Sequence, residues 1–104
     1  MAELVGAENS APVPKYLLFV EQGASSHIVR ITFVKYTHMG VVIESKRGNG
    51  VWEMIGIDTE SPYLDERPLL VAGVPEVREY RLRWWDKGTP NGDWTDIGKV
   101  TVAP

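Results

Sequence analysis

The residues with the most obvious chemical reactivity are two serines and two histidines. Ser25 and Ser26 precede His27, and His38 follows further along the chain. A serine hydroxyl beside an imidazole is the pairing that acyl-transfer enzymes use as nucleophile and base. These residues lie in or beside expected turns, however, and no nucleophile-elbow motif surrounds the serines. We therefore predict that the chain is not an enzyme and has no catalytic residues.

Metal and cofactor chemistry has equally little support in the sequence. Neither histidine is spaced with a second His or a Cys, and the chain contains no cysteine, so we expect both histidines at the surface. A calcium loop would need several acidic residues around a glycine turn. The densest acidic stretch lacks such a glycine, and we interpret it as a solvated loop; it comprises Asp58, Glu60, Asp65 and Glu66. We predict no metal site and no cofactor.

Tryptophan and arginine carry more information than these groups. Trp84 and Trp85 are adjacent, and because side chains alternate along a strand, at least one of them must face outward. We expect Arg81 and Arg83 to flank Trp85 on the outward face. We expect Trp94 to begin a strand beside them, where guanidinium planes can stack on indole rings.

Two interpretations of this group stay open. The arginine stems and stacked cations can simply cover the sheet, which would make the group structural. Alternatively, an exposed aromatic platform can bind a protein partner or a sugar ring, since Trp and Arg are enriched at binding hot spots. The candidate binding surface consists of Trp52, Arg81, Arg83, Trp85 and Trp94.

The elements that must position these residues are β-strands. Short apolar runs rich in Val, Ile, Tyr, Phe and Trp alternate with Gly-containing or polar turns, and no segment shows the spacing of an amphipathic helix. We expect Phe33 to anchor the core. About seven strands joined by tight turns predict an all-β antiparallel sandwich or barrel. The expected strands cover residues 16–21, 27–36, 41–46, 51–58, 63–70, 77–86 and 94–102.

The chain length and the positions of proline and small residues predict one domain. A chain of 104 residues builds a single core. Residues 1–14 are rich in small residues and proline, and we interpret them as a flexible tail or linker before a domain at 15–104. Pro62 and Pro68 suit a protected sheet edge, so we expect a monomer.

Charge and hydropathy limit the partners. The net charge is −3, and the basic residues form no stripe that could follow a phosphate backbone, which argues against nucleic acid. No window approaches the roughly 20 apolar residues of a membrane helix, which argues against a membrane partner. Neither feature predicts a cellular location.

From Val41 onward the chain contains the segments VVIESKRGNGVWEMI, the following YLD, and EYRLRWWDKGTPNGDWT. Together these segments resemble a fibronectin type III domain. The resemblance implies a seven-stranded immunoglobulin-like β-sandwich, although that family usually has a buried Trp where this chain has Phe33. Cytokine-receptor members carry a similar Trp and Arg ladder, and their doubled Trp-Ser motif is present once here, as Trp94-Thr95.

Such domains serve as spacers and as contact modules, and the fold does not decide between these roles. We predict a non-catalytic protein-interaction or spacer module, which can form part of a larger protein. The alternative is an accessory carbohydrate-binding domain that uses exposed tryptophans.

Overall fold

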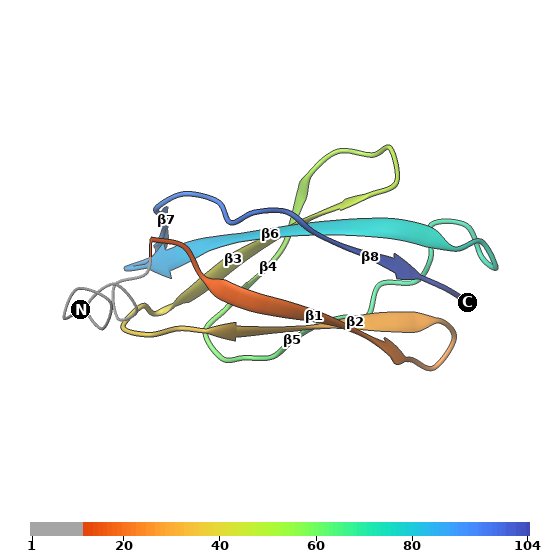
Figure 1. Cartoon of the computed structure of the whole chain (residues 1–104), viewed down its shortest axis with the longest axis horizontal. Helices are drawn as coiled ribbons and strands as arrows, with labels where there is room; N and C mark the ends of the chain where they lie inside the picture. Colours follow the sequence, from red (N-terminus) through yellow and green to blue (C-terminus); the bar gives the residue numbers. More distant parts are fainter. Residues whose placement is uncertain (1–11) are drawn as a thin grey trace, which may run out of the picture.

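The computed structural model describes residues 12–104, a range that contains eight strands and no helix (Figure 1). Residues 1–11, which make up most of the predicted tail, lie outside the described residues. Pro14, near the end of that predicted tail, is buried. The strands are β1 (Lys15–Gln22), β2 (His27–Val34), β3 (Gly40–Arg47), β4 (Glu53–Asp58), β5 (Tyr63–Asp65), β6 (Glu76–Asp86), β7 (Thr89–Asn91) and β8 (Gly98–Val102).

The strands form two antiparallel sheets, which confirms the all-β sandwich class. The smaller sheet has the order β1-β2-β5, and the larger has the order β4-β3-β6-β7, with β8 also paired to β6. In Figure 1 the strands β1 and β2 lie in front of and below the long ribbon of β6. The consecutive strands that pair with each other are joined by short connections, as expected for antiparallel pairs; these are β1 with β2, β3 with β4, and β6 with β7.

Strand β6 organises the larger sheet because it is the longest and pairs on both sides. Along one edge it pairs with β3 from Gly40 opposite Trp85 to Arg47 opposite Arg78. Along the other edge, its first half pairs with β8 and its last residues pair with β7. Side chains that alternate along β6 therefore fall either between the sheets or on the outer face of the larger sheet.

The core lies between the two sheets and follows the period-two pattern of the strands. Phe33 is 6% exposed, so its predicted place in the core is confirmed. Burying such aliphatic and aromatic side chains contributes about 1.5–3 kcal/mol each. The buried cluster consists of Val29, Ile31, Phe33, Val41, Ile43, Tyr80, Leu82, Trp84 and Val102.

The strand count differs from the expected seven at the C-terminal end. The predicted strand at 94–102 is shorter, because β8 begins only at Gly98, and the three-residue β7 forms within the predicted turn before it. Gly98 allows the close approach of β1, since a side chain there would lie 2.7 Å from the Tyr16 hydroxyl. The chain between β7 and β8 is irregular.

The predicted strand at 63–70 is also shorter, since β5 ends at Asp65. Pro68 has no amide to donate to a ladder, which fits the end of pairing in this region. The Asp65 carboxylate accepts a hydrogen bond from the Arg67 amide, at 3.3 Å, so this segment bonds locally instead of continuing the sheet.

Candidate binding face

The outer face of the larger sheet carries the tryptophans and arginines singled out by the sequence. Within β6, Tyr80, Leu82 and Trp84 are buried, whereas the intervening Arg81 and Arg83 are partly exposed. Trp85 is partly exposed as well. The predicted alternation along this strand is confirmed. We call the set Trp52, Arg81, Arg83, Trp85 and Trp94 the tryptophan–arginine face.

Four of these five residues form a stacked ladder. The Cζ atom of Arg81 lies 4.4 Å from the ring centre of Trp52 and 4.4 Å from that of Trp94. The Cζ atom of Arg83 lies 5.3 Å from the ring centre of Trp94. The order is therefore Trp52, Arg81, Trp94, Arg83, and each contact is a cation–π interaction worth about 0.5–1 kcal/mol at an exposed site.

Trp94 reaches the ladder by a route that differs from the predicted strand. Its neighbour Thr95 is buried and exchanges two hydrogen bonds with Leu82 of β6. The Thr95 amide donates to the Leu82 carbonyl at 2.8 Å, and the Leu82 amide donates to the Thr95 hydroxyl at 3.0 Å. The hydroxyl replaces a strand partner, so Trp94 is held beside β6 without belonging to a strand.

Trp52 and Trp85 occupy different positions on this face. Trp52 lies between the turn that follows β3 and the start of β4, and it closes one end of the ladder. Trp85 lies near the end of β6, opposite Gly40 on one side and Pro90 on the other. Arg81 and Arg83 lie on the same outward face as Trp85. In the described residues both guanidinium groups stack on Trp94, and none stacks on Trp85.

The two arginines of the face differ in their charge partners. Glu44 of β3 accepts hydrogen bonds from Arg81 at 2.6 Å and 2.9 Å, which fixes that guanidinium between its two rings. No described residue places a carboxylate within ion-pair distance of Arg83. The Nε atom of Arg83 is buried and has no acceptor among the described residues. The face thus has a closed half around Arg81 and an open half around Arg83 and Trp85.

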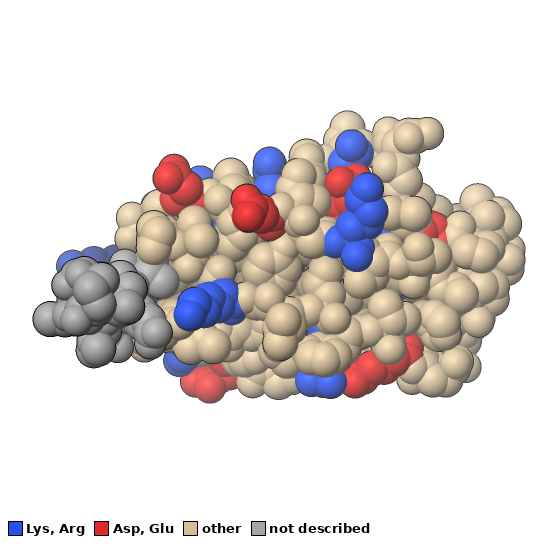
Figure 2. All heavy atoms as spheres, in the orientation of Figure 1, with Lys and Arg blue, Asp and Glu red and all other residues tan. Residues whose placement is uncertain are grey.

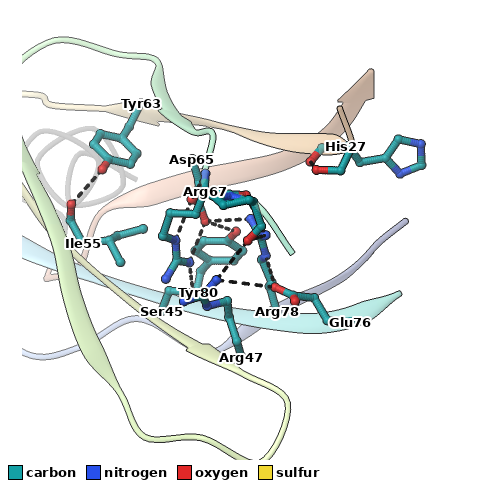
Figure 3. Close-up of polar contacts among 12 residues, drawn as sticks. His27, Ser45, Arg47, Ile55, Tyr63, Asp65, Arg67, Glu76, Arg78 and Tyr80 are labelled. Atoms are coloured by element: carbon teal, nitrogen blue, oxygen red, sulfur yellow. Dashed lines mark hydrogen bonds and ion pairs between the residues drawn. The ribbon is translucent and has the colours of Figure 1, made fainter. Parts of the chain in front are cut away.

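Beneath the other end of the sheet lies a buried ionic network that the sequence analysis missed (Figure 3). Asp65 is 2% exposed, so the prediction of a solvated acidic loop is wrong for this residue. Its carboxylate accepts hydrogen bonds from Arg67 at 2.7 Å and 2.8 Å and from the Tyr80 hydroxyl at 2.6 Å. Arg67 also donates to the Ser45 hydroxyl, which links β5 to β3.

Arg78 is the second centre of this network and is fully buried. It donates to Glu76 at 2.7 Å and to the Arg67 carbonyl at 2.9 Å, and its Nη1 lies 3.3 Å from an Asp65 oxygen. Burial would raise the pKa of the Asp65 carboxyl, but hydrogen bonds from Arg67 and Tyr80 and the nearby guanidinium charges lower it. Asp65 therefore stays ionised, and the network acts as a structural brace.

The two histidines have structural surroundings. The His38 ring stacks on Trp84, with ring centres 3.8 Å apart, and its Nδ1 lies 2.6 Å from the Asp86 carboxylate. The His27 Nδ1 accepts a hydrogen bond from the Ala103 amide. Within residues 12–104, no serine or threonine hydroxyl bonds to either imidazole, and no group of acidic residues and histidines could hold a metal ion. The same range has no helix that could cross a membrane.

Comparisons with family models, with curated proteins and with solved structures gave no match for this chain.

Proposed function

We propose that the protein is a non-catalytic, monomeric interaction module that binds a protein partner through the tryptophan–arginine face. We also propose that its sandwich is of the immunoglobulin-like fibronectin type III kind. The arrangement of β1, β2 and β5 opposite β3, β4, β6 and β8 supports this type, because such sandwiches divide their strands between sheets in a similar way. In this interpretation β7 is a short addition in the last turn.

The observation that carries the proposal is the open half of the face. Trp85 is a large, partly exposed side chain, and no described residue accepts a hydrogen bond from its indole N–H or stacks on its ring. An amphipathic ring with an unused donor is the kind of group that anchors protein interfaces. A purely structural cover for the sheet would not need this third tryptophan, since the ladder of Trp52, Arg81, Trp94 and Arg83 already covers it.

The closed half supports binding in a different way. Arg81 is fixed by two rings and by Glu44, so the backbone and side chains around Trp94 are held in one arrangement. A preorganised surface loses less conformational entropy when a partner binds. The stack of Trp52, Arg81 and Trp94 is therefore a rigid base beside the open half.

The geometry favours a protein partner over a sugar ligand, a spacer role and a nucleic-acid partner. A sugar-binding platform needs free indole faces, but Trp52 and Trp94 already stack with guanidinium groups, which leaves Trp85 as the single unstacked ring of the face. A spacer would need no anchor at all. Nucleic acid is disfavoured because Figure 2 shows basic groups scattered among acidic ones on the side it presents.

Comparative capture tests the proposed function. We expect the immobilised protein to retain a specific protein from a lysate of the source organism, quantified by mass spectrometry. Trp85→Thr should reduce that retention roughly tenfold or more, which is the effect of losing a hot-spot anchor. The matched control is Leu17→Thr, which removes an exposed apolar side chain from the outer face of the smaller sheet and should leave retention unchanged.

Two results would count against this function. If Trp85→Thr leaves the set of retained proteins unchanged, the tryptophan–arginine face is not the binding surface. If a glycan array gives specific binding that Trp85→Thr abolishes while no protein is retained, the carbohydrate-binding alternative replaces the proposal.

A further inference from the structure

Arg83 differs from every other arginine in its charge environment. Each of the others has a carboxylate within 4.0 Å; these are Arg30, Arg47, Arg67, Arg78 and Arg81. Among the described residues Arg83 has none. It interacts instead with the Trp94 ring, at 5.3 Å, and this contact supplies no negative charge to neutralise the guanidinium.

The guanidinium of Arg83 is also partly removed from water. Its Nε atom is buried without a hydrogen-bond acceptor in the described residues. On β3, the residue opposite Arg83 is Val42, which is 5% exposed, and Val42 in turn lies opposite Ile57 of β4. A partly desolvated charge next to apolar side chains interacts more strongly with an incoming counter-charge than a fully hydrated one does.

The local charge balance defines which anion fits. Arg81, the nearest guanidinium along β6, already holds Glu44 at 2.6 Å. The open half therefore offers a single uncompensated positive charge. A carboxylate, with one negative charge and a planar pair of oxygens, balances the charge of one guanidinium, whereas a phosphate dianion would keep one negative charge uncompensated beside it.

We propose that the protein partner presents an aspartate or glutamate carboxylate to Arg83, beside an apolar group that contacts Trp85. This inference rests on the proposed function, because it specifies the chemistry of the partner at the same face. Arg83 thereby selects the partner, and Trp85 supplies the apolar contact area.

The test uses a small carboxylate probe and nuclear magnetic resonance of the ¹⁵N-labelled chain. We expect N-acetylglutamate amide to shift the Arg83 Nε–Hε signal and the Trp94 indole signal in a saturable way. The uncharged N-acetylglutamine amide, at the same concentration and ionic strength, should not. The shift at Arg83 should be at least about twice that at Arg30, whose guanidinium already pairs with Glu21 at 2.7 Å.

Two matched variants test whether Arg83 is the residue that binds the carboxylate probe. Arg83→Gln should abolish the shift of the Trp94 indole signal, while Arg30→Gln should preserve it, with both folds checked by their amide spectra. Equal shifts with the two probes, or an Arg83→Gln variant that still responds, would overturn the inference. Such a result would leave the proposed function standing if Trp85→Thr still loses the captured protein, so the two failures are distinguishable.

Discussion

Replacing Arg78 by alanine should lower the free energy of unfolding by about 3–5 kcal/mol. The side chain is fully buried and bonds to Glu76 and to the Arg67 carbonyl, beside the Asp65 carboxylate. Its removal takes one of two guanidinium partners from each of Asp65 and Glu76 in a low-dielectric setting. It also leaves the Arg67 carbonyl without this donor. Urea denaturation followed by circular dichroism measures the loss, and the melting temperature should fall by at least about 10 °C.

Two further variants serve as controls for the loss of stability in Arg78→Ala. Lys35→Ala removes a solvent-exposed ion pair with Glu60 and should cost less than about 1 kcal/mol. Arg78→Lys retains the charge but loses the planar fork, so its loss of stability should be smaller than that of the alanine variant. If Arg78→Ala is no more destabilising than Lys35→Ala, the buried network is not a structural brace.

Replacing Trp84 by alanine should lower the free energy of unfolding by a similar amount, about 3–5 kcal/mol, because the substitution leaves a cavity in a closely packed core. Trp84 is 2% exposed, stacks on the His38 ring and meets the Tyr36 ring edge-on at 6.5 Å. Thermal unfolding by calorimetry gives the change in stability.

The adjacent tryptophan is the control for this second prediction. Trp85→Ala removes an indole of the same size from the outer face, and we expect a loss well below that of Trp84→Ala. A comparable loss from both positions would contradict the assignment of one indole to the core and the other to the surface.

The alternation along the strands made much of the fold predictable. Short apolar runs between turn residues indicated an all-β antiparallel fold, and the adjacent pair Trp84 and Trp85 required one indole to face outward. Period-two geometry depends only on the backbone, so it can be read directly from sequence. The positions of Arg81 and Arg83 on the outer face followed from the same rule.

Contacts between distant segments could not be predicted in this way. Asp65 looked like part of a solvated acidic loop, but Arg67, Arg78 and Tyr80 surround it in the folded chain. The sequence signal was the spacing of Asp65 and Arg67, which places opposite charges two residues apart. Whether such a pair is buried depends on tertiary packing, which local patterns do not encode.

The sequence predicted which residues belong to the tryptophan–arginine face, but not which guanidinium stacks on which indole ring. Stacking of Arg81 and Arg83 on Trp94 depends on the hydrogen bonds between Thr95 and Leu82, and these fix a register outside any strand. A threonine directly after Trp94 was the available signal. Its hydroxyl can substitute for a backbone partner, and this substitution placed Trp94 beside Arg81 and left Trp85 in the open half.

Fluorescence quenching by acrylamide tests most directly whether the tryptophan–arginine face is open at Trp85. Four variants, each with one Trp→Phe substitution, assign the quenchable emission to individual tryptophans. Trp85→Phe should remove a larger share of the quenchable emission than any other substitution, and Trp84→Phe should leave that emission almost unchanged. If Trp85 proves as shielded as Trp84, the face is a structural cover and the proposed binding role is wrong.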